Sequence, residues 1–252
     1  MRPGFIVATL LSLFLVNTAS AAEIRVLSAV ALAEPLRELG PQFERSTGHK
    51  LTMQFGPPVA LKALVESGET FDLVILTPAF VDQLAKQGKI NADTRMDIAR
   101  DGLGVAVHAG APKPDVTSVE AFKHAMLNAK SIVINAGGAA GPAYFNAVFR
   151  RLGIAQDVEP KIKSQPTPQD TLKAIANGDG ELGFVIVSMI KSAERIELAG
   201  PLPSELQNYL TFTGAVASGA READGARALL KFLASDTAAT VIKAKGLQPA
   251  VR

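Results

Sequence analysis

Histidine is the side chain best suited to acid–base or metal chemistry near neutral pH, and this chain has three of them. They are His49, His108 and His124, and none lies in a motif typical of a metal site, such as H-E-x-x-H. Cysteine is absent, which excludes disulfides, thiolate nucleophiles and cysteine-ligated metal sites.

A glycine-rich stretch at residues 137–141 is the other pattern that could do chemistry. It has neither the Gly-Lys-Ser/Thr of a phosphate-binding loop nor the order of a dinucleotide-binding fingerprint. Two interpretations are open: the glycines let a helix pack closely, or they present backbone N–H groups to an anion. A G-x-S-x-G elbow is missing too. We therefore expect no catalytic residue, no metal ion and no cofactor.

Segments with the composition of strands alternate with helical patterns along the chain. Residues 71–76 form a nearly continuous apolar run, which is typical of a buried parallel strand. Residues 32–43 repeat apolar side chains at helical spacing, and Pro41 is expected to kink or interrupt that helix. The expected strands are residues 24–27, 50–55, 71–76, 103–107, 131–134, 182–187 and 209–217. This alternation predicts an α/β fold whose sheets are mostly parallel and flanked by helices.

A Gly/Pro-rich linker at residues 110–114 separates two such β-α-β-α-β patterns, so we expect two lobes. In parallel α/β sheets, ligands bind beyond the carboxyl ends of the strands, where helix N-termini direct their N–H groups. The predicted pocket is therefore built from five turns that follow strands. These turns are residues 28–31, 56–60, 77–78, 137–143 and 186–188.

Residues 1–21 have the features of a cleaved export signal. Arg2 supplies a positive charge, residues 5–16 are apolar, and Ala19-Ser20-Ala21 forms a small-x-small cleavage pattern. The apolar segment is shorter than the roughly 20 residues that span a membrane. We expect cleavage after Ala21 and a soluble periplasmic protein.

The charge composition bears on whether the protein binds nucleic acid. The 252 residues include 26 Lys or Arg and 24 Asp or Glu, a formal net charge of +2. A nucleic-acid-binding protein would show a basic patch or stripe, so nucleic acid is not an expected partner. The hydrophobic fraction of 48% and charged fraction of 20% are typical of a globular protein.

Several short motifs follow one another in a characteristic order behind the export signal. They are Val26-Leu27-Ser28-Ala29, Phe43-Glu44 with Thr47-Gly48, Phe55-Gly56, Phe71-Asp72-Leu73, Leu152-Gly153, Glu181-Leu182-Gly183 and Leu229-Leu230 with Phe232-Leu233. In this order they resemble the periplasmic molybdate-binding protein family, the type II solute-binding proteins of ABC transporters. The resemblance covers essentially the whole chain after residue 21.

The resemblance implies a two-lobed type II periplasmic binding fold. Lobe 1 would comprise residues 23–108 and 212–252, and lobe 2 residues 109–211. Two strands would cross the hinge, near residues 105–108 and 210–214. A small anionic ligand would bind between the lobes of a monomer, hinge motion would close them, and an ABC permease in the inner membrane would receive the closed form.

The chain departs from the family where hydroxyl groups are expected to bind the oxyanion. By alignment, Ala31 and Ile186 replace a Ser and a Tyr, and the turn after the second strand carries Pro57 and Pro58 instead of serines. Because a buried anion must be hydrogen-bonded, such losses favour an organic acid over a molybdate- or tungstate-type oxyanion. The expected ligand-binding residues are Ser28, Ala29, Val30, Ala31, Gly56, Pro57, Val59, Thr77, Gly138, Gly141, Ala143, Tyr144, Ile186 and Ser188.

Two other functions are open on the same scaffold: an exported ligand-sensing module and an exported enzyme. An enzyme would need an acid–base pair in the cleft. The five turns contain no Asp, Glu, His or Lys, which argues against it.

Overall fold

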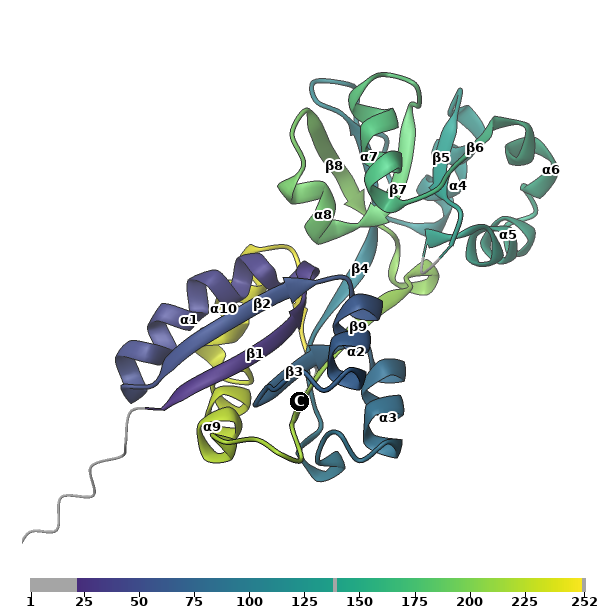
Figure 1. Ribbon diagram of the computed structural model, residues 1–252. Helices are drawn as coiled ribbons and strands as arrows, with labels where there is room; N and C mark the ends of the chain where they lie inside the picture. Colours follow the sequence, from purple (N-terminus) through teal and green to yellow (C-terminus); the bar gives the residue numbers. More distant parts are fainter. Residues whose placement is uncertain (1–21, 138–139, 251–252) are drawn as a thin grey trace, which may run out of the picture.

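The computed structural model describes residues 22–137 and 140–250, and the chain forms two lobes joined by a narrow waist (Figure 1). Gly138, one of the expected ligand-binding residues, lies outside the described residues, as does the expected export signal. No helix in the described part of the chain is long and apolar enough to span a membrane.

Lobe 1, as we use the term, is built on the sheet order β2-β1-β3-β9-β4. Its strands are β1 (Glu23–Ala29), β2 (Lys50–Gly56), β3 (Leu73–Leu76), β9 (Tyr209–Val216), the first half of β4 (Met96–His108) and the short β10 (Gln248–Pro249). Its helices are η1 (Val30–Leu32), α1 (Ala33–Thr47), α2 (Pro58–Glu66), α3 (Pro78–Lys86), η2 (Ala92–Thr94), α9 (Ala223–Leu233) and α10 (Asp236–Ala244).

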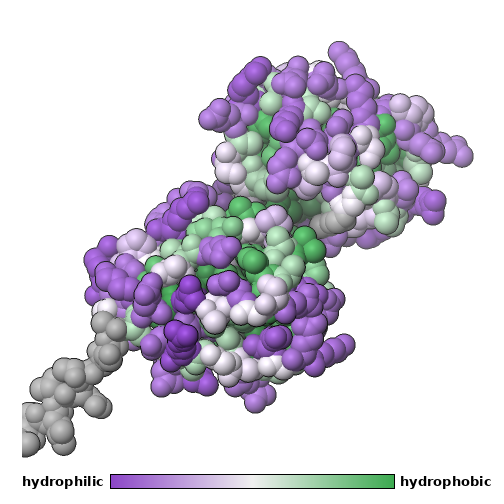
Figure 2. Space-filling model, in the orientation of Figure 1, coloured by the Kyte–Doolittle hydropathy of each residue, from purple (hydrophilic) through white to green (hydrophobic). Residues whose placement is uncertain are grey.

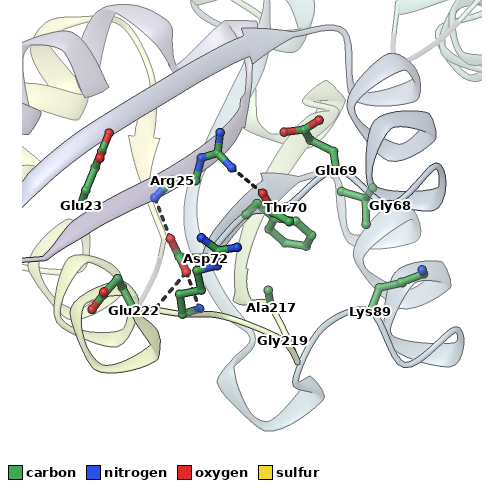
Figure 3. Close-up of a pocket in the computed structure, with 13 residues that line it drawn as sticks. Glu23, Arg25, Gly68, Glu69, Thr70, Asp72, Lys89, Ala217, Gly219 and Glu222 are labelled. Atoms are coloured by element: carbon green, nitrogen blue, oxygen red, sulfur yellow. Dashed lines mark hydrogen bonds between the residues drawn. The ribbon is translucent and has the colours of Figure 1, made fainter.

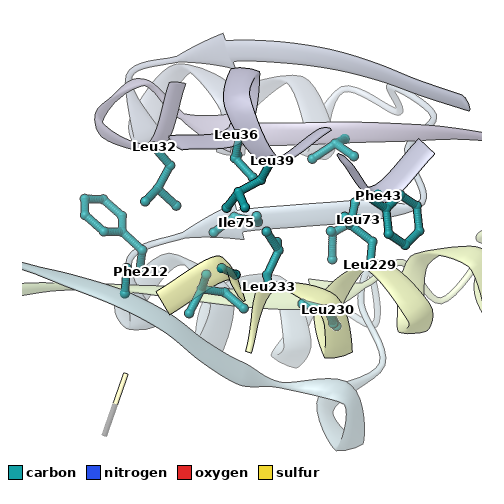
Figure 4. Packing of buried hydrophobic residues seen from close by; sticks show 14 of the residues in the cluster. Leu32, Leu36, Leu39, Phe43, Leu73, Ile75, Phe212, Leu229, Leu230 and Leu233 are labelled. Atoms are coloured by element: carbon teal, nitrogen blue, oxygen red, sulfur yellow. The ribbon is translucent and has the colours of Figure 1, made fainter. Parts of the chain in front are cut away.

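Apolar clusters cover both faces of this sheet. On one face, leucines of α1 and α9 pack with Leu73, Ile75 and Phe212 of the strands (Figure 4). On the other face, α2 and α3 pack on Val74 and Leu76. Successive side chains of β3 point to opposite faces of the sheet, and both faces are covered, so all its side chains are buried and apolar. This agrees with the buried strand predicted from the apolar run at residues 71–76.

Lobe 2 continues the sheet in the order β4-β7-β5-β6, with β8 pairing the second half of β4. Its strands are β5 (Ile132–Asn135), β6 (Ile162–Gln165), β7 (Leu182–Ile186) and β8 (Ile196–Pro201). Its helices are α4 (Val119–Asn128), α5 (Pro142–Arg151), α6 (Ala155–Val158), η4 (Glu159–Lys161), α7 (Pro168–Ala176), α8 (Val187–Ser192) and η5 (Ser204–Leu206). The predicted α/β fold class is confirmed. The outer strands of each lobe pair in parallel, and the strands around the waist pair antiparallel.

Strand β4 joins the two lobes as one continuous strand of 13 residues. It pairs with β9 as far as Gly102 and with β7 from Leu103 onward. The strand therefore changes from one sheet to the other between these two residues. The residue boundaries that the resemblance implies for the lobes stay a prediction.

The expected interruption at Pro41 does not occur, because α1 runs through this residue without a break. The alternative, a kink at Pro41, stays a prediction. Proline removes one intrahelical hydrogen bond and costs about 3 kcal/mol in a helix interior. Leu36, Leu39 and Phe43 are buried on the same face of α1, and their packing on the sheet outweighs that cost.

Asp72 ties three segments of lobe 1 together at the amino end of β3 (Figure 3). Its buried carboxylate accepts hydrogen bonds from the backbone N–H groups of Arg25 at 2.9 Å, Arg221 at 2.8 Å and Glu222 at 3.0 Å. β1 and the chain entering α9 are thus held by one side chain.

Asp101 lies in β4 next to the point where the strand changes sheets, and its side chain is fully buried. Oδ1 accepts a hydrogen bond from the backbone N–H of Ser188, the second residue of α8, at 3.3 Å. Oδ2 has no hydrogen-bond partner in the part of the chain that the structure describes. Burial raises the pKa of Asp101 from 3.8 to about 6, and the hydrogen bonds from the start of α8 oppose that rise. Asp101 therefore links the waist strand to a helix of lobe 2.

Asp72→Ala should lower the free energy of unfolding by about 2–4 kcal/mol, because it leaves three backbone N–H groups without their acceptor. Urea unfolding of the two proteins at pH 7 measures this difference. Asp93→Ala, which removes an exposed carboxylate from η2, is the control and should change stability by less than about 0.5 kcal/mol. Equal losses in the two variants would contradict the tethering role.

Asp101→Asn should change the pH dependence of stability. Between pH 3.8 and about 6, Asp101 is protonated in the folded protein and ionised in the unfolded chain, because its folded pKa is raised. The free energy of unfolding therefore falls as pH rises through this window. The wild type minus Asp101→Asn difference in unfolding free energy should therefore decrease by up to about 3 kcal/mol from pH 4 to pH 7. Urea titrations at four pH values test this. A difference that does not vary with pH contradicts the assigned burial.

Candidate ligand-binding cleft

The main candidate site is a cleft of about 900 Å³ at the junction of the two lobes. Both lobes contribute side chains, including those of β9 at the waist. The lining residues are Ala29, Val30, Ala31, Glu34, Pro35, Pro58, Gln169, Ile186, Ser188, Met189, Lys191, Ser192, Leu210, Phe212, Ala244, Lys245 and Leu247. On the face shown in Figure 2, apolar residues gather around this junction, whereas the outer edges of both lobes are mostly hydrophilic.

The described residues that the sequence analysis selected all lie where a strand ends and a helix begins. These five junctions are β1–η1, β2–α2, β3–α3, β5–α5 and β7–α8. Five of the selected residues line the cleft: Ala29, Val30, Ala31, Ile186 and Ser188. The residues at the end of β1 in lobe 1 and at the end of β7 in lobe 2 thus line the same cavity.

The other selected residues do not line this cavity, and their placements differ. They are Ser28, Gly56, Pro57, Val59, Thr77, Gly141, Ala143 and Tyr144. Ser28 is fully buried in β1, and Val59 is exposed on α2. Thr77 precedes α3, where its carbonyl group accepts backbone hydrogen bonds.

Tyr144 and Gly141 have structural partners at the start of α5. The Tyr144 hydroxyl donates a hydrogen bond to the carbonyl of Leu206, and its ring packs edge-on against Phe145. Burial raises the pKa of Tyr144 to about 12. A Cβ on Gly141 would lie 3.0 Å from the backbone of Gly137, so this turn needs glycine for close packing. This contact supports the packing interpretation of the glycine-rich stretch.

Helix α8 contributes polar residues to the cleft: Ser188 was expected there, whereas Lys191 and Ser192 were not. Ser188, Lys191 and Ser192 line the cleft and stand at the spacing i, i+3, i+4, which places them on one face of a helix. We expected residues 182–187 to be a strand and assigned no helix after it. Because α8 begins directly at the end of β7 and has only six residues, no break in the apolar run marks its start.

The charged side chains of the cleft leave one positive charge without an opposite charge. Glu34 forms an ion pair with Arg37 at 2.7 Å, and Lys245 forms one with Glu38 at 2.8 Å. The hydrogen bond to Glu38 raises the pKa of Lys245. Lys191 has no ion pair or hydrogen bond among the described residues. The cleft therefore suits an anion.

Two backbone positions of the cleft have no N–H group to offer an oxyanion. The N–H of Ser188 already donates to Asp101, and proline at position 58 has no N–H. The described residues include no group of three or more His, Asp or Glu that could hold a metal ion. His124 lies 3.5 Å from the carboxylate of Glu120, and both side chains are exposed on α4. The expectation of no metal and no cofactor stays a prediction.

A second hollow, of about 630 Å³, opens at the amino ends of β1 and β3, away from the cleft (Figure 3). Its cations are Arg25, Lys89 and Arg221, and its acidic residues are Glu23, Glu69, Asp72 and Glu222. Because acidic residues outnumber basic ones there, this hollow offers no positive excess to an anion.

Comparison with known proteins shows the family. The profile of the bacterial extracellular solute-binding proteins matches residues 24–248. A Pseudomonas protein named aconitate isomerase is 30% identical over 231 residues, covering 90% of this chain and 87% of that protein. The molybdate-binding protein ModA of Azotobacter vinelandii is 26% identical, covering 90% of each chain.

A solved structure shows the same fold. The substrate-binding domain of a molybdenum ABC transporter from Clostridium difficile superposes with a TM-score of 0.79 at 18% identity, covering 92% of this chain and all of that one. The predicted resemblance to molybdate-binding proteins is confirmed, as is the periplasmic binding fold. Whether the chain is an enzyme stays a prediction, because one relative is named an isomerase. The chain belongs to the bacterial extracellular solute-binding proteins.

Proposed function

We propose that this protein captures a small organic acid with two or three carboxylates in the cleft between its lobes. The observation that carries the proposal is the charge of the lining: the walls are largely apolar, and among the described residues no carboxylate forms an ion pair with Lys191. A buried carboxylate needs such a partner, and the carbon skeleton of an organic acid suits the apolar walls.

The cleft lining disfavours a tetrahedral oxyanion. Such a dianion needs a full shell of N–H and O–H donors, since each missing hydrogen bond to a charged group costs about 1.5–3 kcal/mol. Ala31, Pro58 and Ile186 line the cavity with side chains that donate no hydrogen bond. A cleft of about 900 Å³ also exceeds what one oxyanion fills.

The relative named aconitate isomerase supports the same ligand class. Aconitate is an unsaturated tricarboxylate, and the similarity to that protein extends over 90% of this chain. Aconitate and its saturated analogues are therefore the first ligands to test.

Export and delivery complete the proposal. The family supports an exported protein. Residues 1–21 would be removed after Ala21, and the remaining chain would act as a periplasmic monomer. An ABC permease would receive the closed, loaded form, as the name of the structural neighbour suggests.

Isomerisation of aconitate is the second candidate, favoured by the name of the same relative. The reaction can proceed by removal of a proton from the methylene carbon and its return to the former vinyl carbon, with the double bond moving between them. One proton changes place and no oxidant is needed. The carboxyl group of Asp101 lies beside the cleft residues Leu210 and Ser188, but it is fully buried, so the sequence similarity alone carries this candidate.

The ligand class predicts a selective thermal shift. Residues 22–252 should be stabilised by citrate, cis- or trans-aconitate or tricarballylate. At 100 times its dissociation constant a ligand adds about 2.7 kcal/mol, or roughly 5–11 °C for a chain of this size. Molybdate, tungstate, sulfate and phosphate should shift the midpoint by less. A shift with molybdate or tungstate alone would contradict the proposed ligand class.

The second candidate predicts turnover rather than binding alone. If the protein is an isomerase, the vinyl proton signal of cis-aconitate in a proton NMR spectrum should be replaced by that of trans-aconitate, and exchange in heavy water should incorporate deuterium. Heat-denatured protein is the control. Stable binding with unchanged vinyl signals over hours would reject catalysis and leave the binding function.

A further inference from the structure

We infer that α8 carries the carboxylate-binding subsite of the cleft, with Lys191 as the residue that pairs with the ligand's charge. The inference rests on the proposed function and names the residue that would determine its specificity. Ser188 is one of the expected ligand-binding residues, and Lys191 is not.

The short helix presents a cation and two hydroxyl-bearing residues to one cavity. Ser188, Lys191 and Ser192 all line the cleft, and their spacing places them on the same face of α8. A lysine ammonium has three donors, so Lys191 can bind both oxygens of one carboxylate. Ser188 is already engaged by its hydrogen bonds to Asp101. The Ser192 hydroxyl bonds to the carbonyl of Met189 and is less available.

Packing against lobe 1 holds the Lys191 stem in place. A Cβ on Gly246 would lie 2.8 Å from Cδ and 3.4 Å from Cε of Lys191, so the stem passes directly over the bare α-carbon of that glycine. Gly246 has φ +91°, which also favours glycine. A long side chain whose methylene groups are packed keeps fewer rotamers, which reduces the entropy lost when its ammonium binds a ligand.

This contact also places the charge between the lobes. α8 belongs to lobe 2, and Gly246 follows α10 of lobe 1. A carboxylate bound by Lys191 therefore lies near both walls of the cleft. The acidic residue of the lining, Glu34, is already paired with Arg37 and does not compete for the lysine.

Lys191→Met tests the inference, because it keeps an unbranched stem over Gly246 and removes the charge. Calorimetric titration of the 22–252 protein with trans-aconitate and with citrate should show binding weakened about 10-fold or more. Lys191→Arg should keep most of the affinity, since it restores a cation with several donors.

Lys86→Met is the matched control, because Lys86 is also exposed in the last turn of a helix, α3, and lies outside the cleft. It should bind both acids like the wild type. Melting temperatures of all variants check folding, and Lys191→Gln provides a second uncharged variant.

The outcomes distinguish failure of the proposed subsite from failure of the proposed function. The subsite is supported if Lys191→Met and Lys191→Gln lose affinity while the other variants keep it. Wild-type affinity in both overturns the subsite and leaves the organic-acid function in place. Failure of the wild type to bind any of the tested carboxylates overturns the proposed function and the subsite together.

Discussion

The continuity of β4 across two sheets is the constraint on which the rest of the molecule depends. One strand pairs with β9 in lobe 1 and, from Leu103 onward, with β7 in lobe 2, so the distance between the lobes is set by a hydrogen-bonded ladder rather than by a loose linker. Asp101 stands at the change of sheet and accepts a hydrogen bond from the start of α8. The helix that lines the cleft is thereby anchored to the strand about which the lobes would move.

The charge of the cleft connects this architecture to a ligand class. Anchoring α8 at Asp101 uses the Ser188 N–H and directs the following turn, with Lys191, toward lobe 1. The remaining lining is largely apolar, and its other charges are compensated by Arg37 and Glu38. A site of this kind suits a carboxylate on a carbon skeleton better than a compact oxyanion, because it offers a cation and largely apolar walls. The fold is shared with the molybdate binders, and we propose that the ligand differs.

Much of the fold could be predicted from the sequence, because buried strands such as β3 and helices such as α9 carry strong apolar patterns. The missed strands β6 and β8 lack that pattern, since they are short and only partly buried. Pro41 misled the prediction because tertiary packing outweighs local propensity there.

The candidate site was predictable only in part. Residues at strand ends follow from topology, which is why Ala29, Ala31 and Ile186 were found. Lys191 was missed for two reasons. The start of α8 has no sequence signal, because the helix begins without a break after β7. The position of the Lys191 side chain also depends on Gly246, which is distant in the sequence.

A crystal structure of residues 22–252 with trans-aconitate tests the central claim most directly. We predict the ligand between the lobes, with one carboxylate within about 3.2 Å of Lys191 Nζ. Density for the ligand elsewhere, or a cleft that takes up only molybdate or tungstate from a mixture with the acid, would contradict the account.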